Sequence, residues 1–294
     1  MKQRTIRNPI HAKGVGIHTG KRSCITLKPA KENTGIVFYK NGQEVTPIKA
    51  HIHNVTNTSL CTSIEHDGVK VHTIEHLLSA ISGLGIDNLR IYLEGSEVPI
   101  MDGSASHFVF MLQGGGIIEQ RATKRYVKIL EPVEVVDEKN KRFCRLLPYD
   151  GFRISFQIVY QHSYFNQMNQ YSCLEVDSES FLRRLSRSRT YGFVSDYDKL
   201  KQNNLALGAN LSNAIAFDEH DVINQEGLRY GDECVKHKIL DALGDLYLLG
   251  HSIIGHFEGY CSGHYLNQQL LKKLLSMPSA WEYVGPKMSR NIAL

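Results

Sequence analysis

The five-residue segment His72-Thr-Ile-Glu-His76 contains two side chains that could bind a metal ion and one that could act as a base. In a helix these three side chains can line one cleft, but they can equally face water on the polar side of an ordinary surface helix. The segment also matches the H-x-x-E-H pattern of inverzincin peptidases, in which both histidines bind zinc and the glutamate is the base. That interpretation requires a further acidic ligand, which the segment does not supply.

A second segment, His237-Lys-Ile-Leu-Asp241, places an imidazole and a carboxylate four residues apart. In a helix these two side chains lie on one face, and Asp245 continues that face one turn later. The opposite face is apolar. A His-Asp-Asp stripe is unusual for a helix that packs on a core, although it could also be solvated or paired with a neighbouring cation.

Together the two segments could supply His76, His237 and Asp241 to one cation. Two imidazoles and one carboxylate, with a fourth position left for water, are the ligands of a catalytic zinc site. Zinc would lower the pKa of a bound water to roughly 7, and Glu75, adjacent to a ligand, is placed to accept its proton. The residue types therefore predict a zinc-dependent hydrolase, with the peptidase motif as a rival in the same class.

The hydrophobic pattern predicts the elements that must hold these residues. Apolar residues at helical spacing predict one helix over residues 73–82, a second over 236–250 and a third over 178–188. Short runs rich in β-branched and aromatic residues precede the helices in each half and are typical of strands. A polar stretch places a domain boundary between residues 1–122 and 123–294. We therefore expect an α+β fold of two similar domains, each a sheet with helices packed on one face.

The overall composition narrows the class of partner. A net charge of +4 over 294 residues fits an anionic small molecule but is far from the strongly basic character of a nucleic-acid-binding protein. No apolar run is long enough to cross a bilayer, and residues 1–14 have basic side chains but no apolar core behind them, so we do not expect them to act as a secretory signal. The six cysteines lack the spacing of a zinc ribbon or redox motif, so we expect free thiols and a cytoplasmic protein. No obligate protein partner is evident.

Several further segments occur in an order that characterises one enzyme family. They are Gly14-Val-Gly-Ile-His-Thr-Gly20, Thr73-Ile-Glu-His-Leu77, Gly85-Ile-Asp-Asn88, Pro99-Ile-Met-Asp-Gly-Ser104, Ser188-Arg-Thr190 with Gly192-Phe193, His237-Lys238 with Asp241, and Ser262-Gly-His264. Together they resemble the UDP-3-O-(3-hydroxyacyl)-N-acetylglucosamine deacetylases, zinc amidases of lipid A synthesis in Gram-negative bacteria. The resemblance covers nearly the whole chain. It implies one catalytic Zn²⁺ ion per chain and a small-molecule substrate, an acylated UDP-sugar.

The resemblance also implies a role for each polar residue of the site. The implied zinc ligands are His76, His237 and Asp241. Glu75 would be the general base. His264 would be the general acid, or would stabilise the oxyanion as a cation, and Asp245 would orient it by a hydrogen bond. Thr190 would donate to the oxyanion, and Lys238 would face the substrate.

The implied active site lies at the junction of the two domains, and each domain carries an insert. The second insert, residues 192–222, would form an apolar passage for the acyl chain, although such a row of small and apolar residues is equally typical of core packing. The expected substrate contacts are Leu60, Tyr160, Tyr191, Phe193, Val194, Tyr197, Ala206, Leu211 and Ala216. Of these, Tyr160 would face the uracil. Some relatives carry a lysine where this chain has Leu147, so Lys238 or a nearby arginine would have to supply that phosphate contact here.

A non-enzymatic alternative is a nucleotide-sugar-binding or lipid-binding protein with a structural metal ion. A structural zinc is normally closed by four protein ligands, often thiolates, and the cysteine nearest in sequence to the proposed ligands is Cys234. Inhibition by a hydroxamate, which needs an open position on the metal, would distinguish the two hypotheses.

Overall fold

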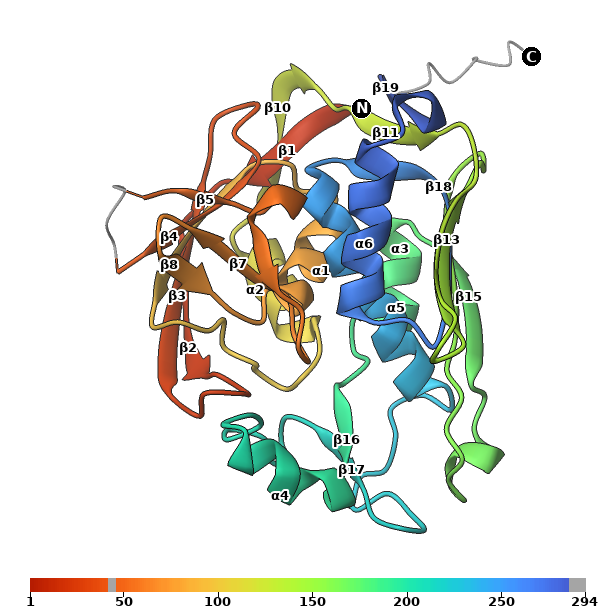
Figure 1. Cartoon of the computed structure of the whole chain (residues 1–294). Coiled ribbons are helices and arrows are strands. Elements are labelled where there is room, and N and C mark those ends of the chain that lie inside the picture. The colour runs from red at the N-terminus through yellow and green to blue at the C-terminus, as the bar shows by residue number, and fades with distance from the viewer. Residues whose placement is uncertain (42–45, 286–294) are drawn as a thin grey trace, which may run out of the picture.

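The computed structural model describes residues 1–41 and 46–285, and in this part of the chain two sheets enclose a layer of helices. Figure 1 shows α1 (Glu75–Gly83), α5 (Glu233–Leu246) and α6 (His264–Leu275) between a sheet of N-terminal strands on one side and a sheet of C-terminal strands on the other. Each sheet therefore has helices on one face, which confirms the predicted α+β fold.

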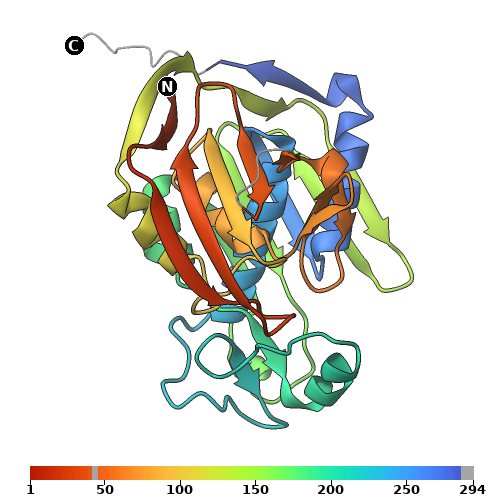
Figure 2. The same cartoon turned by 90° about the vertical axis from the view of Figure 1, so that its left-hand side faces the viewer.

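The first sheet has five strands in the order β2-β3-β9-β4-β5, and Figure 2 shows it face on with the helices behind. The strands are β2 (Ile10–Val15), β3 (Arg22–Pro29), β4 (Ile36–Lys40), β5 (Ile48–Lys49) and β9 (Leu89–Glu94). In β3, Ser23, Ile25 and Leu27 are buried and alternate with more exposed residues, as expected for a sheet that packs helices on one face only. Smaller sheets flank it, made by β1 (Lys2–Ile6) with β10 (Ile117–Thr123), and by β6 (Val55–Asn57), β7 (Ser63–His66) and β8 (Val69–Val71).

The second sheet has seven strands, and β18 at its centre pairs with three neighbours. The strands are β11 (Tyr126–Ile129), β12 (Val133–Asp137), β13 (Arg142–Leu147), β14 (Phe152–Gln157), β15 (Tyr171–Glu175), β18 (Ser252–Tyr260) and β19 (Trp281–Val284). Strand β18 alternates buried and half-buried residues along its whole length, with Ile253 and Phe257 facing the helices. The domain boundary predicted at residues 122 and 123 falls at the end of β10 and stays a prediction.

The described residues form six α-helices, and three of them lie where helices are predicted. They are α1 (Glu75–Gly83), α2 (Ser106–Gly114), α3 (Ser178–Ser180), α4 (Val194–Gln202), α5 (Glu233–Leu246) and α6 (His264–Leu275), with 3₁₀ turns at Ile52–Asn54, Phe165–Gln167, Tyr247–Leu249 and Pro278–Ala280. The helix predicted over 73–82 starts two residues later, because Thr73 has a φ of 58°, which an α-helix cannot include. The helix predicted over 178–188 is confirmed as far as Leu185, but α3 continues as a π-helical turn over Phe181–Leu185, in which the Ser186 N–H donates to the Phe181 carbonyl.

Helices α1 and α5 cross at very short distance because Gly244 lies at the crossing. A Cβ atom at Gly244 would lie 2.1 Å from the carbonyl oxygen of Glu75, so any other residue would push the helices apart. Eight of the nine residues of α1 are buried, and α1 is therefore not the surface helix that its polar residues suggested. The crossing brings His76 on α1 directly against the polar face of α5.

The segment predicted as an insert lies apart from the layered body, below it in Figures 1 and 2. It contains α4 and a two-stranded parallel sheet of β16 (Tyr191–Phe193) and β17 (Ile215–Phe217). Unlike α1 and α5, helix α4 has no buried residue. Within the described residues, none of the helices combines the length and apolar character needed to span a membrane.

Candidate active site

The α1–α5 crossing brings three predicted metal ligands together in the interior. The Asp241 Oδ1 atom lies 3.4 Å from His76 Nε2 and 3.3 Å from His237 Nε2, and all three ligand atoms lie within 4.8 Å of one another. Four ligands at about 2.0–2.2 Å from a zinc ion would lie roughly 3.3–3.6 Å apart at the corners of a tetrahedron. Asp241 Oδ1 is buried and accepts no hydrogen bond, which is costly for a carboxylate oxygen unless a cation balances it. The three side chains therefore fit a metal ion.

Hydrogen bonding and burial hold His237 in the form that binds a metal. Its Nδ1 lies 3.1 Å from the Ser188 carbonyl oxygen, which can only accept, so Nδ1 carries the proton and Nε2 is free to coordinate. Burial, with a smaller contribution from His76, lowers the pKa of His237 to about 3, although Asp241 opposes the shift. The imidazole is therefore neutral at physiological pH.

The second carboxylate oxygen of Asp241 accepts a hydrogen bond of 2.8 Å from the Lys238 ammonium. Burial alone would raise the pKa of Asp241, but His237 and Lys238 reverse this and hold it well below its usual range. Burial also opposes the charge on Lys238, and Asp241 nevertheless raises the pKa of that ammonium above its ordinary value. Asp241 therefore stays ionised with one oxygen left for a cation.

Glu75 lies beside His76, His237 and Asp241, and its side chain is buried. One oxygen accepts a hydrogen bond of 3.0 Å from the Thr62 backbone N–H, and the other lies 3.8 Å from His264 Nε2. Burial raises the pKa of Glu75, although His264 and His76 oppose the shift. A carboxylate whose pKa is moved toward neutrality is suited to accept and return a proton.

His264 at the start of α6 is held by Asp245 of α5. Its Nδ1 donates to Asp245 Oδ2 at 2.8 Å, and the same carboxylate accepts hydrogen bonds from Thr62 Oγ1 at 2.6 Å and Asn267 Nδ2 at 2.9 Å. Burial would lower the pKa of His264, but Asp245 and Glu75 raise it to about 9. His264 is therefore an imidazolium at neutral pH, with its Nε2–H directed toward Glu75.

Two residues of this network, Thr62 and Asn267, were not identified from the sequence. Asn267 lies three residues after His264 on α6, and this helical spacing is a signal that could have been used. Thr62 lies in a loop 183 residues from Asp245 and carries no local pattern.

A buried ion pair, which no sequence pattern indicates, fixes the segment that carries Thr190. The Arg189 guanidinium is 2% exposed and donates to Glu233, the first residue of α5, at 2.9 Å, and the Arg189 backbone N–H donates to the same oxygen. The residue before Arg189 is Ser188, whose carbonyl binds His237, and the residue after it is Thr190. The Arg189–Glu233 pair therefore fixes the 188–190 segment against the start of α5.

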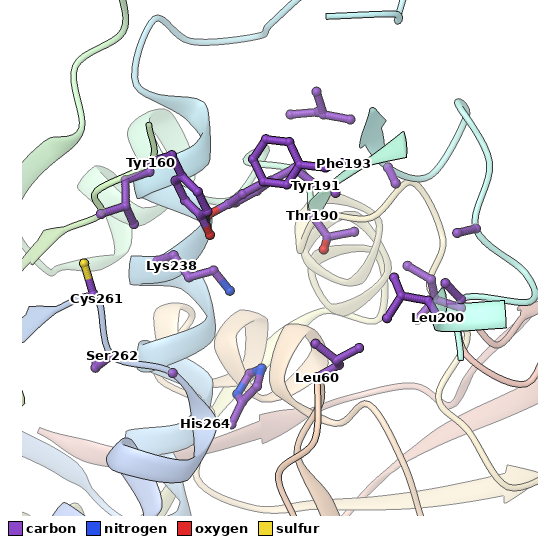
Figure 3. A pocket seen from close by; sticks show the side chains of 18 of the residues that line it. Leu60, Tyr160, Thr190, Tyr191, Phe193, Leu200, Lys238, Cys261, Ser262 and His264 are labelled. Carbon is purple, nitrogen blue, oxygen red and sulfur yellow. Dashed lines mark hydrogen bonds between the residues drawn. The ribbon is translucent and has the colours of Figure 1, made fainter. Parts of the chain in front are cut away.

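A cleft of about 1000 Å³ borders this cluster. Lys238 and His264 line it and contact Asp241 and Glu75, so the cleft reaches the cluster through these two side chains. Figure 3 shows the Lys238 ammonium, the His264 imidazole and the Thr190 hydroxyl pointing into the same cavity. The predicted substrate contacts that also line the cleft are Leu60, Tyr160, Tyr191, Phe193, Val194, Tyr197, Ala206, Leu211 and Ala216.

One wall of the cleft is aromatic and another is apolar and open. Tyr160 packs against Phe165 and Phe193 with ring centroids 4.8 and 5.3 Å apart, and its hydroxyl hydrogen-bonds that of Tyr191. By contrast, Leu60 and Leu211 are about half exposed although they are large and apolar. Exposed apolar side chains gathered at a cleft are typical of a ligand-binding surface.

His72 does not belong to the group of three side chains that could hold a metal ion. It precedes α1, and its Nδ1 makes a hydrogen bond of 2.8 Å with Ser63 Oγ. Over residues 1–41 and 46–285, the single group of three His, Cys, Asp or Glu side chains positioned to hold a metal ion is His76, His237 and Asp241. The six cysteines are free thiols, and none belongs to that group.

Comparisons with known proteins give one consistent result. The family model described as UDP-3-O-acyl N-acetylglycosamine deacetylase matches residues 3–276. A UDP-3-O-acyl-N-acetylglucosamine deacetylase of Coxiella burnetii (strain CbuK_Q154) is 51% identical over 285 residues, covering 97% of this chain and 93% of the relative. The protein of the same name from Chromohalobacter salexigens is 48% identical, with the same coverage of both chains.

Proposed function

The chain belongs to the UDP-3-O-acyl N-acetylglycosamine deacetylase family of hydrolases, and from this premise we propose that it removes the acetyl group of UDP-3-O-(3-hydroxyacyl)-N-acetylglucosamine, a step of lipid A biosynthesis. The products are the free amine and acetate. The observation that carries the proposal is the buried group of His76, His237 and Asp241 with a carboxylate on one side and an imidazolium beside it. Amide hydrolysis needs these parts: a base for water, stabilisation of the oxyanion and an acid for the nitrogen.

We propose that one zinc ion per chain is held by His76, His237 and Asp241. When bound, zinc would polarise the acetamide carbonyl and lower the pKa of a bound water to roughly 7. The same ligands would also accept ferrous iron or cobalt. The donor set, the short spacing and the unpaired Asp241 oxygen support this assignment.

Glu75 would accept the proton of the attacking water, because it is the buried carboxylate adjacent to a ligand and its pKa is raised by burial. The Thr62 N–H fixes one of its oxygens, which leaves the other free for the proton.

His264 would donate a proton to the departing nitrogen. It enters the reaction as an imidazolium, because Asp245 raises its pKa to about 9 even though burial opposes the charge. Asp245 also fixes the ring, since its bond to Nδ1 directs the Nε2–H toward Glu75 and the reacting group. Before the proton leaves, the same positive charge would stabilise the oxyanion.

Thr190 and Lys238 would complete the polar surface that faces the substrate. The hydroxyl of Thr190 points into the cleft and would donate to the oxyanion (Figure 3). Lys238 is held by Asp241 at the cleft wall and would face the sugar or its first phosphate.

The two ends of the substrate would occupy different walls of the cleft. The acyl chain would lie along the apolar residues of the insert, and the uracil would lie against Tyr160. The diphosphate needs cations, and besides Lys238 the cleft is lined by Lys141 and Arg142 at the turn between β12 and β13. Burial raises the pKa of the Cys261 thiol, another residue of the cleft, and Arg142 lies close enough to oppose that shift in part. We assign the diphosphate to these two side chains, which replace the lysine that is absent at Leu147.

We propose that the protein acts in the cytoplasm on this small molecule, without an obligate protein partner. Six free thiols support a reducing compartment.

The test is acetate release from UDP-3-O-(3-hydroxyacyl)-N-acetylglucosamine by the purified chain, before and after removal of metal by a chelator and return of zinc. We expect turnover that is lost with the metal, restored by zinc and inhibited by a hydroxamate. Binding of the substrate without any acetate release would contradict the proposal and favour the non-enzymatic alternative.

A further inference from the structure

The glycine-rich segment 14–20 has no role in the chemistry proposed above, yet a buried carboxylate from elsewhere in the chain holds it. Glu97 is 1% exposed and accepts hydrogen bonds from the backbone N–H groups of His18 at 2.9 Å and Thr19 at 2.8 Å, and from Thr19 Oγ1 at 2.7 Å. A fourth bond, of 2.9 Å, comes from Thr73 Oγ1, just before α1. A carboxylate removed from water needs such donors, and here three of the four come from the loop between β2 and β3.

The same loop is bonded to the insert. The Leu207 N–H donates to the His18 carbonyl at 3.1 Å, and the Gly208 N–H donates to the Ile17 carbonyl at 2.9 Å. The Ala206 N–H donates to His18 Nδ1 at 3.4 Å. These bonds join a loop of the first sheet to the segment that carries the apolar wall of the cleft.

Glycines permit this contact at two places. A Cβ atom at Gly16 would lie 2.1 Å from Glu97 Oε2, and a Cβ atom at Gly208 would lie 2.3 Å from the Gly16 carbonyl oxygen. Both distances are far below van der Waals contact. The loop, the carboxylate and the insert can therefore approach one another only with glycine at both positions.

The contact forms part of the cleft wall. Ile17, His18 and Ala206 line the cleft together with Leu60, whose backbone also hydrogen-bonds His18. A shift of the loop would thus move the insert relative to Leu60 and change the width of the apolar passage.

We propose that Glu97 is a positioning residue that sets acyl-chain recognition, by holding the 16–21 loop against residues 206–208 of the insert. The inference rests on the proposed function, since it assigns the apolar wall to the acyl chain. Glu97 touches no substrate and acts through His18, Thr19 and the insert. A glutamine at this position would turn an NH₂ group toward the N–H of either His18 or Thr19, so it would weaken the contact although its shape is the same.

The test compares two substrates, the acylated UDP-sugar and UDP-N-acetylglucosamine, which lacks the acyl chain. The variants are Glu97→Gln and Thr19→Val, which removes one donor on the loop side, with Thr73→Val as the matched control on the α1 side. We expect Thr19→Val and Glu97→Gln to lower kcat/KM for the acylated substrate roughly tenfold or more, mainly through KM, while the value for UDP-N-acetylglucosamine changes less than about twofold. Thr73→Val should leave the ratio of the two kcat/KM values unchanged.

An equal loss on both substrates, or no loss on either, would overturn the inference. If Glu97→Gln does not fold, as judged by its melting temperature, Thr19→Val decides the question. Failure of the wild type to deacetylate the acylated substrate would refute the proposed function instead, so the two failures are distinguishable.

Discussion

The crossing of α1 and α5 and the insert after Tyr191 both border the cleft, but they are built differently. At the crossing, Glu75 and His237 are 2% exposed, and hydrogen bonds to the backbone of Thr62 and Ser188 hold their side chains. In the insert, Leu211 is 46% exposed and α4 contributes no buried residue. Charged groups that must hold one geometry lie in the interior, where the electrostatic effect of each neighbour is largest. A flexible acyl chain needs only apolar area, which an exposed segment can supply.

This comparison predicts that substitutions at the crossing change kcat and that substitutions in the insert change KM. The largest effect is expected for Glu75→Gln, which keeps the shape of the side chain but cannot accept the proton. We expect kcat to fall by about 10²–10⁴-fold with little change in KM, measured by acetate release under saturating substrate. Zinc content should be unchanged, because Glu75 is not one of the three proposed ligands. A variant that keeps wild-type kcat would remove Glu75 from the mechanism.

A smaller but more diagnostic effect is expected for Asp245→Asn. Asp245 raises the pKa of His264 to about 9, so the imidazolium acid is present below that pH and is lost as the pH rises through it. Without the carboxylate, the alkaline limb of the kcat profile should move to lower pH, and kcat at pH 8 should fall by about 10–100-fold. An alkaline limb that stays in place would show that another group is the acid.

The residues of the site could be predicted from the sequence only in part. The spacing of His237, Asp241 and Asp245 identified α5 because four-residue repeats lie on one helical face. Whether His72 is a ligand could not be judged from helical spacing, because Thr73 has a left-handed backbone and His72 therefore lies outside α1. The pairing of Asp245 with Thr62 depends on tertiary contact between distant segments and has no local signal. The family resemblance, and not periodicity, identified His264 and Thr190.

The fold was predictable where hydrophobic period and segment length agreed, as in α5 and the strands of both sheets. It was not predictable over residues 178–188, where the periodic pattern suggested one helix. There the chain leaves the helix after a π-helical turn, and Arg189 enters the interior to pair with Glu233. This ion pair overrides the local preference for a helix. It joins residues 44 positions apart, so no local pattern in a single sequence predicts it.

At the phosphate end of the cleft, Arg142→Ala should raise KM about tenfold and leave kcat nearly unchanged, because a charge-assisted bond to the diphosphate would be lost. The effect should shrink in high salt, since Arg142 is exposed. Lys139→Ala in the same turn is the matched control, because Lys139 does not line the cleft. Equal effects of the two variants would indicate general attraction and not a phosphate site.

The smallest effect is expected in the insert. Leu211→Ser should raise KM for the acylated substrate by about two- to fivefold, because Leu211 is already half exposed and loses only part of its apolar contact. Leu130→Ser, at a residue of similar exposure outside the cleft, should have no effect on KM. A change in kcat with constant KM for Leu211→Ser would contradict the expectation that substitutions in the insert act on KM.

The most direct test of the account is the zinc content per chain of the wild type, His72→Ala and His237→Ala, purified in the same way. We predict about one zinc ion per chain for the wild type and for His72→Ala, and a large loss for His237→Ala, because the proposed ligands lie on α1 and α5 together. Retention of zinc by His237→Ala with loss by His72→Ala would contradict the account, since the metal would then be held by the His72–His76 segment alone.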